Sequence, residues 1–276
     1  MTDLFKGLYI VSTPIGNLDD ITIRALNTLK NSDFILCEDT RQTLKLLNFY
    51  NIKKKLIAYH KFNEKKSLST IIRYLNEGKI LSLVSDAGTP LISDPGNILI
   101  NECIKNGHNI FTIPGPSSVI AAVSLSGFDD EFIFQGFLPK KEKKTIECLK
   151  NLKDADYSLV FFAPANKVNT YITYFKKYFS GRKIFIAREM TKKHESYYRD
   201  DVDKIKPFKI DLKGELTIVV SKKFKKSKIL LDYKYLEKEI VEYLKRYKLK
   251  DVVELMSTKE KVSKKIIYKL CLKNKK

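Results

Sequence analysis

Five short apolar runs alternate with helix-like stretches over the first 113 residues, and this alternation restricts the fold more than any other feature of the chain. The runs cover 8–11, 34–37, 55–59, 80–85 and 109–113. In one intervening stretch, 68–75, leucine and isoleucine recur at i, i+3, i+4 and i+7, which is the spacing of one helix face. Strands that alternate with helices predict a mainly parallel sheet with right-handed crossovers. We therefore predict an α/β domain over residues 1–125.

The pattern changes near Gly127, where strand-like runs begin to follow one another more closely. These runs cover 132–138, 157–162, 183–187, a short stretch near 196–198, and 215–220. Helix-like patterns intervene only near 143–152 and 168–179. This half predicts a second α/β domain with a mixed sheet, residues 126–225. A lysine-rich linker and a helical pattern follow, which predict a small basic helical extension over 226–276.

Three strands of the first predicted sheet run into loops rich in glycine and proline, at 13–17, 86–96 and 114–118. Because parallel strands end at the same edge, we expect the three loops to meet where open α/β sheets bind ligands. Gly88 and Gly115 let a ligand approach the backbone closely. The chain has neither GxxxxGK[ST] nor GxGxxG. Any one loop could be an ordinary turn, but three on one edge favour a small-molecule cofactor held by backbone and shape.

The segment Glu38-Asp39-Thr40-Arg41 ends another strand of the same sheet. In one interpretation Asp39 or Thr40 caps the next helix and Arg41 is a surface charge. In the other, a carboxylate accepts a substrate proton and Arg41 contacts a phosphate or ribose. Asp86 and Asp94 allow the same two interpretations. His60 closes the third strand, where a lone histidine is more often a hydrogen-bonded loop residue than a base.

The chain carries a formal net charge of +20, which suggests an anionic partner, nucleic acid first. A general bias toward lysine explains the charge equally well. Lysines gather at 140–144, 222–226 and 264–276, where they favour phosphates. Four well-separated cysteines predict a protein with reduced thiols and no metal site. An amino terminus without a signal-like pattern predicts a cytoplasmic protein, and no apolar run is long enough to predict a membrane span.

Several motifs, in their order and spacing, resemble one known family. They are VSTPIGNLDDITIRAL, EDTR, LVSDAGTPLISDPG, IPGPSSVIAA and FQGFLPKK, followed by AREMTK at 187–192 and KGEL at 213–216. Together they are similar to the small-subunit ribosomal RNA ribose 2'-O-methyltransferases of the tetrapyrrole methylase superfamily. The resemblance implies two α/β domains with S-adenosylmethionine between them, usually in a homodimer. It also implies a cytidine of the decoding centre as substrate, in free RNA or in the assembled small subunit.

The resemblance also implies roles for individual positions. The cofactor site would comprise Pro14, Asp86, Ala87, Gly88, Thr89, Pro90, Pro114, Gly115, Ser117 and Ser118. The substrate would face Glu38, Asp39, Arg41, His60, Asn63 and Glu64, with Lys140 and Lys141 on nearby phosphates. Ala163 stands where relatives usually carry Glu, and Phe62 where a second His is common. The first loop lacks the GxGxGD form of porphyrin-modifying enzymes, which argues against a tetrapyrrole substrate.

The implied chemistry is in-line attack of a ribose 2'-oxygen on the methyl group of the cofactor. We predict Asp39 or Glu38 as the proton acceptor and Arg41 as the contact to the neighbouring phosphate. Three other functions compete with this one. A methyltransferase of the same fold could act on a tetrapyrrole or a protein, and a non-enzymatic RNA-binding protein would account for the charge. A nucleotide-binding hydrolase is the weakest alternative, because its phosphate loop is missing.

Overall fold

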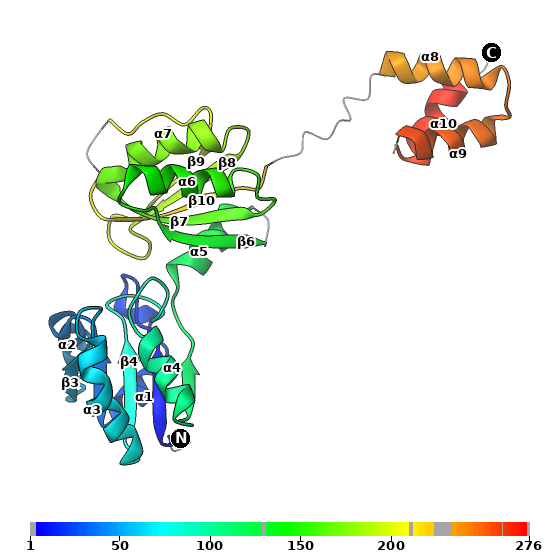
Figure 1. The fold of residues 1–276 in the computed structure, drawn as a ribbon. Helices are drawn as coiled ribbons and strands as arrows, with labels where there is room; N and C mark the ends of the chain where they lie inside the picture. Colours follow the sequence, from blue (N-terminus) through cyan, green and yellow to red (C-terminus); the bar gives the residue numbers. More distant parts are fainter. Residues whose placement is uncertain (1–3, 129–130, 210–211, 224–232, 261, 275–276) are drawn as a thin grey trace. The chain divides into compact units, whose positions relative to one another are not determined.

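A computed structural model describes residues 4–128, 131–209, 212–223, 233–260 and 262–274. The chain divides into two units, residues 1–223 and 224–276 (Figure 1). The first unit contains two five-stranded sheets and the second contains three helices. The fold prediction, two α/β domains with a helical extension, is confirmed. The predicted lysine-rich linker lies mostly outside the described residues.

The first sheet contains five parallel strands in the order β3-β2-β4-β1-β5. They are β1 Gly7–Val11, β2 Phe34–Cys37, β3 Lys55–Ala58, β4 Ile80–Val84 and β5 Ile110–Ile113. The helices between them are α1 Ile23–Asn31, α2 Thr40–Phe49, α3 Glu64–Asn76 and α4 Asn97–Lys105. Alternate strand residues enter two apolar clusters, one packed with α1 and α2 and the other with α3 and α4. Helices therefore cover both faces of the sheet, as all-parallel sheets require.

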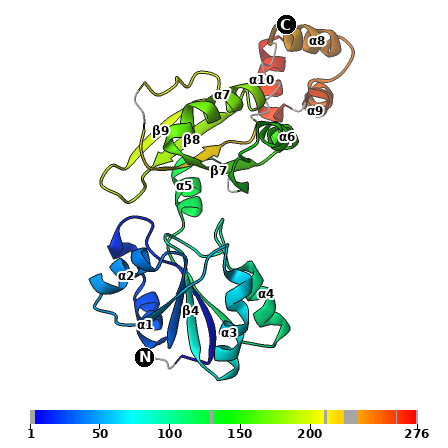
Figure 2. The same cartoon turned by 60° about the vertical axis from the view of Figure 1, so that its left-hand side comes forward.

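Helix α5, Ser118–Ser126, carries the chain from the first sheet to the second (Figures 1 and 2). Ser117 is its N-cap, and its hydroxyl accepts a hydrogen bond from the Ile120 N–H at 3.5 Å. Val119 and Ala122 pack against strands of the second sheet. The predicted first domain, 1–125, thus contains a helix whose core contacts lie with the second sheet. The domain boundaries remain predictions.

The second sheet has the order β6-β7-β10-β8-β9 and is mixed, as predicted, with β6 parallel to β7 and the other pairs antiparallel. Its strands are β6 Phe132–Phe137, β7 Ser158–Pro164, β8 Lys183–Arg188, β9 Ser196–Asp201 and β10 Glu215–Val220. Helices α6 Glu142–Leu152 and α7 Val168–Tyr178 cover one face, and α5 packs on the other. The central strand β10 is the last strand in the sequence and joins β7 to β8.

The second unit is a three-helix cluster of α8 Tyr233–Leu244, α9 Leu249–Glu260 and α10 Lys264–Lys273. Ile240, Met256 and Ile267 are fully buried at its centre. Tyr243 packs against this core, whereas Tyr247 and Tyr268 are 55% and 47% exposed. The described helices include none with the length and apolarity needed to cross a membrane.

Candidate active site

The loops that follow β1, β4 and β5 meet at the carboxyl edge of the first sheet, as predicted. Thr13 and Gly88 exchange both backbone hydrogen bonds, at 2.9 and 3.0 Å. The hydroxyl oxygens of Ser12 and Thr89 lie 3.1 Å apart, and the Thr89 hydroxyl donates to the Pro116 carbonyl at 3.1 Å. Hydrogen bonds therefore join the three loops into one continuous surface.

Both glycines singled out in these loops serve contacts between the loops. Gly88 has a φ of +81°, and a Cβ there would lie 3.3 Å from Ile15 Cγ2. A Cβ on Gly115 would lie 2.9 Å from the Ser12 Cβ, closer than real Cβ atoms approach. The sequence analysis assigned this bare backbone to a ligand. In the structure it lets one loop approach another, and Gly88 also lines the cavity above these loops.

A cavity of about 400 Å³ opens above these loops and is closed on its far side by the second sheet. Six of the residues predicted for the cofactor line it: Asp86, Ala87, Gly88, Thr89, Ser117 and Ser118. The other four, all described, lie outside the lining: Pro14, Pro90, Pro114 and Gly115. The volume lies within the range of small-molecule sites. The loops after β4 and β5 therefore supply one wall of a ligand-sized cavity.

Three carboxylates from the first domain line this cavity and make it acidic. Glu38, at the end of β2, lines it together with Asp86 and Asp94. Burial raises the pKa of all three carboxyls, and neighbouring carboxylates add to the rise. The pKa of Asp94 reaches about 6. Among the described residues no group of three or more His, Cys, Asp or Glu has the arrangement of a metal site.

Asp39 and Arg41 are engaged with each other. Asp39 is the N-cap of α2, and its carboxylate accepts the Arg41 N–H at 2.9 Å. The Arg41 guanidinium donates to both oxygens of that carboxylate, at 3.0 and 2.7 Å. These bonds lower the pKa of Asp39 to about 2. The capping interpretation of Asp39 is thus confirmed. Neither Asp39 nor Arg41 is among the described residues that line the cavity. The prediction of a proton acceptor now rests on Glu38.

The five remaining predicted substrate residues, all of them described, lie outside the cavity lining. Glu64 is buried, and one carboxylate oxygen accepts the Gly96 N–H at 2.8 Å and the Tyr59 hydroxyl at 3.2 Å. Asn63 accepts the His60 N–H at 2.8 Å and donates to the Ala58 carbonyl at 2.9 Å. These two side chains support the loops after β3 and β4. The Nδ1 atom of His60 is buried without a partner among the described residues.

Lys140 and Lys141 are exposed where α6 begins, and Lys141 is the residue before its first turn. Phe62 is 94% exposed. These three described side chains are therefore accessible to a partner, and none of them lines the cavity.

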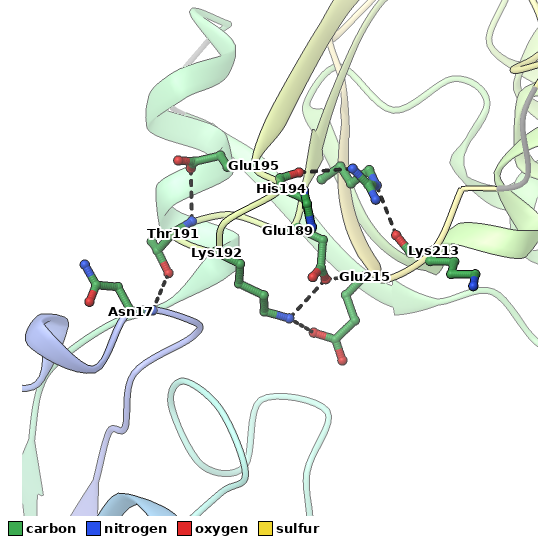
Figure 3. A network of polar contacts seen from close by, with 9 residues as sticks. Asn17, Glu189, Thr191, Lys192, His194, Glu195, Lys213 and Glu215 are labelled. Atoms are coloured by element: carbon green, nitrogen blue, oxygen red, sulfur yellow. Dashed lines mark hydrogen bonds and ion pairs between the residues drawn. The ribbon is translucent and has the colours of Figure 1, made fainter. Parts of the chain in front are cut away.

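The second-domain wall lies where the resemblance implied a cofactor between the two domains, but the sequence analysis assigned none of its residues to the cofactor site. This wall consists of Phe137, Phe162, Ala163, Pro164, Ala187, Glu189, Met190, Lys192, Gly214, Glu215, Leu216 and Thr217. Ala163, which the sequence analysis singled out as a departure from the family pattern, is buried in this wall. Figure 3 shows its polar part, where the Lys192 ammonium donates to Glu189 at 3.0 Å and to Glu215 at 3.4 Å. The motifs AREMTK and KGEL contain these residues, so the signal was present in the sequence without an assigned role.

Removal of the Asp94 charge tests the electrostatics of this cavity. Because the pKa of Asp94 in the folded protein, about 6, lies above its ordinary 3.8, folding takes up a proton between those pH values. Asp94 therefore costs stability progressively as pH rises from about 4 to about 6. We expect Asp94→Asn to raise the free energy of unfolding at pH 7 by on the order of 1 kcal/mol, after allowance for solvent screening.

Urea unfolding at pH 4.5 and at pH 7 measures this effect, and Asp33→Asn is the matched control because its carboxylate is an exposed partner of Lys79. The difference in the free energy of unfolding between the variant and the wild type should be smaller at pH 4.5 than at pH 7. Parallel stability profiles for the two proteins would contradict the assignment.

Comparison with known proteins places this geometry in a family. The family described as Tetrapyrrole (Corrin/Porphyrin) Methylases matches residues 7–206. The chain belongs to this family. It is 45% identical over 224 residues to a Thermotoga maritima protein named ribosomal RNA small subunit methyltransferase I, an alignment that covers 78% of this chain and 98% of that relative. A Mesomycoplasma conjunctivae protein of the same name is 47% identical, with 80% and 94% covered.

Solved structures with low sequence identity share the fold. Uroporphyrin-III C-methyltransferase from Thermus thermophilus, complexed with S-adenosyl homocysteine, superimposes with a TM-score of 0.56 at 13% identity and covers 78% of this chain and 97% of its own. Diphthine synthase gives a TM-score of 0.57 at 16% identity, with coverage of 78% and 89%. Both likenesses support the two-domain α/β architecture.

Proposed function

We propose that the protein methylates the RNA of the small ribosomal subunit with S-adenosylmethionine as the methyl donor. The observation that carries the proposal is the identity of 45% and 47% to relatives named for that activity, one of them matched over 98% of its length. The alternative of a non-enzymatic RNA-binding protein leaves the ligand-sized cavity without a purpose. A hydrolase lacks support among these relatives.

The residues of the cavity fit the proposed cofactor. Its volume of about 400 Å³ suits a small molecule, and apolar residues such as Val119, Met190 and Leu216 offer a surface for a planar base. Glu38, Asp86 and Asp94 provide negative charge for a cationic ligand. Among the described lining residues Lys192 is the only cation, and it is paired with Glu189 and Glu215. S-adenosylmethionine supplies a methyl group bound to a sulfonium sulfur. An oxygen nucleophile can attack the methyl carbon and displace the sulfur as the leaving group.

We further propose that the acceptor is the 2'-oxygen of a cytidine ribose, as the resemblance of the first-half motifs implies. Glu38 takes the hydroxyl proton, because its carboxylate lines the cavity and its raised pKa makes it a better proton acceptor than Asp39. The acidic cavity repels phosphates, so they remain at its rim, near Arg41 and Lys140. We also propose that the protein acts in the cytoplasm and that it forms a homodimer. Light scattering would test the homodimer.

Calorimetry with S-adenosylmethionine, followed by transfer of labelled methyl groups to small subunits that lack ribose methylation, tests the proposal. We expect binding, label in the RNA, and 2'-O-methylcytidine after complete nuclease digestion. Label on a base would contradict the ribose assignment alone. Binding without any label in RNA would contradict the substrate class.

The helical unit gives a separate prediction for RNA binding. Lys245, Arg246 and Lys248 are exposed at the turn between α8 and α9, beside the exposed Tyr247. If they neutralise RNA phosphates, replacing all three with Gln should reduce the slope of log K against log salt by about 2. The matched control replaces Lys259, Lys264 and Lys273, each of which lies 2.8 Å from a glutamate oxygen. Equal slopes for the two triple variants would show that net charge alone matters.

A further inference from the structure

The loop from Glu189 to Glu195 joins β8 to β9 and supplies Glu189, Met190 and Lys192 to the cavity wall. Two of its residues have left-handed backbone conformations, with φ of +50° at Glu189 and +64° at Thr191. Such conformations are unfavourable for residues other than glycine, above all for β-branched threonine. They persist only where the surroundings hold them, and they gather at functional sites.

Hydrogen bonds within this loop and to other residues of the second domain hold it in place. The Glu189 carboxylate accepts the Glu215 N–H at 2.9 Å as well as the Lys192 ammonium (Figure 3). The Glu195 carboxylate accepts the Thr191 N–H at 3.0 Å and the hydroxyl of Tyr197. The loop is therefore rigid where it projects toward the first domain.

The projecting tip of the loop contacts the first-domain loop that follows β1. The Asn17 N–H donates to the Thr191 hydroxyl oxygen at 2.9 Å (Figure 3). Gly16 sits so close that a Cβ would lie 2.4 Å from Lys192 Cγ and 2.7 Å from Thr191 Oγ1. Since the backbone of Gly16 is not left-handed, only this contact requires glycine there. We call the contact between Gly16, Asn17 and Thr191 the latch.

Residues adjacent to the latch in the chain line the cavity, in both the first-domain loop and the second-domain loop. Ile15, which precedes Gly16, lines the cavity and packs against the second-sheet cluster that contains Met190. Met190 and Lys192 flank Thr191 and line the opposite wall. The distance between the two walls therefore depends on contact between the two loops.

We infer that Gly16 and Thr191 are positioning residues, which hold the two walls of the cavity at the separation that cofactor binding requires. The inference rests on the proposed function and extends it to residues that do not themselves line the cavity. A bound cofactor touches both walls only when the latch is closed. Weakening the latch should therefore lower affinity for the cofactor without altering the groups that contact it.

Four variants of the full chain test the latch. Thr191→Val keeps the branched shape and removes the acceptor, whereas Thr191→Ser keeps the hydroxyl. Gly16→Ala adds the excluded Cβ. Asn17→Ala is the matched control, because it keeps the backbone N–H and removes only the side chain that accepts the Asp19 N–H at 3.1 Å.

We expect Thr191→Val to raise the Kd of S-adenosylmethionine in calorimetry by up to about 5-fold, as the loss of one hydrogen bond allows. Gly16→Ala should raise it further and lower kcat by up to about 100-fold through misplacement of the walls. Thr191→Ser and Asn17→Ala should bind like the wild type. In the cofactor-free protein, the amides of residues 190–192 should exchange hydrogen faster in Gly16→Ala and Thr191→Val.

Wild-type Kd values and wild-type exchange rates in both Gly16→Ala and Thr191→Val would overturn the inference. Equal impairment of Thr191→Ser and Thr191→Val would also overturn it, because the hydroxyl would then have no role. If the wild type does not bind S-adenosylmethionine, the proposed function fails, while hydrogen exchange of the free protein still decides whether the latch forms.

Discussion

Replacing Glu38 with Gln is expected to lower kcat for methyl transfer by about 10²–10⁴-fold, the contribution typical of a general base. The change keeps the size of the side chain and removes its capacity to accept a proton. Glu38 follows β2 directly and its side chain is half-buried in the cavity lining. The Kd of S-adenosylmethionine should rise far less than kcat falls, because Asp86 and Asp94 keep their negative charge in the cavity and the loops after β4 and β5 are unchanged.

The matched control is Asp39→Asn, one residue further along the chain. Asp39 caps α2 and holds Arg41, and bonding to Arg41 keeps its pKa near 2. We expect this variant to stay folded, since Asn also caps helices, and to retain most of its activity. A loss of kcat in Asp39→Asn equal to that in Glu38→Gln would contradict the assignment.

The pH dependence of kcat provides an independent measurement. Burial and the neighbouring Asp86 raise the pKa of Glu38 above its ordinary value. A base acts in its ionised form, so kcat should fall as pH decreases through this raised pKa. In Glu38→Gln that acid limb should disappear from the profile. An unchanged limb would assign the titration to another group, such as Asp94.

Replacing Arg182 with Met is expected to reduce the free energy of unfolding by about 3 kcal/mol, because buried backbone carbonyls lose their charged donor. Arg182 is 1% exposed and immediately precedes β8. Its guanidinium donates to four backbone carbonyls, those of Lys153 and Ala155 at 2.8 Å, Ser221 at 3.1 Å and Tyr157 at 3.3 Å. The variant leaves these carbonyls without their donor, and each unsatisfied buried group costs about 1–3 kcal/mol.

Urea unfolding followed by circular dichroism measures this loss. Arg73→Met is the matched control, because its side chain is 65% exposed and its pair with Glu77 spans 3.8 Å on the surface of α3. We expect a change of about 0.5 kcal/mol or less for the control. If the two variants lose equal stability, the carbonyl network around Arg182 contributes little.

Much of the first domain could be predicted from the sequence, because three of its strands run into loops rich in glycine and proline and the intervening helices have regular apolar spacing. The meeting of the three loops followed from the parallel sheet alone. The sheet order could not be predicted, since no local pattern says that β4 lies between β2 and β1. For the same reason the residues of the second-domain wall were not assigned to the cofactor, although Glu189, Lys192 and Glu215 stand in the quoted motifs.

The different roles of two adjacent carboxylates could not be predicted from the sequence either. Glu38 and Asp39 follow one strand, and only the direction of each side chain decides which enters the cavity and which caps α2. Glu64 shows the same limit, because its burial beneath the Gly96 N–H depends on the tertiary fold. Local patterns specify the backbone of a turn more fully than the partners of its charged side chains.

The position of β10 in the second sheet affects how the protein is made. Synthesis proceeds from the amino terminus, and domains generally fold as they emerge. All strands of the first sheet are available once residue 113 has left the ribosome, whereas the second sheet lacks its central strand until residue 220 has done so. Until then the pairs β6–β7 and β8–β9 have no strand between them. Because β10 also supplies Leu216 and Thr217 to the cavity, a nascent chain completes its binding site only after the second sheet has received its central strand.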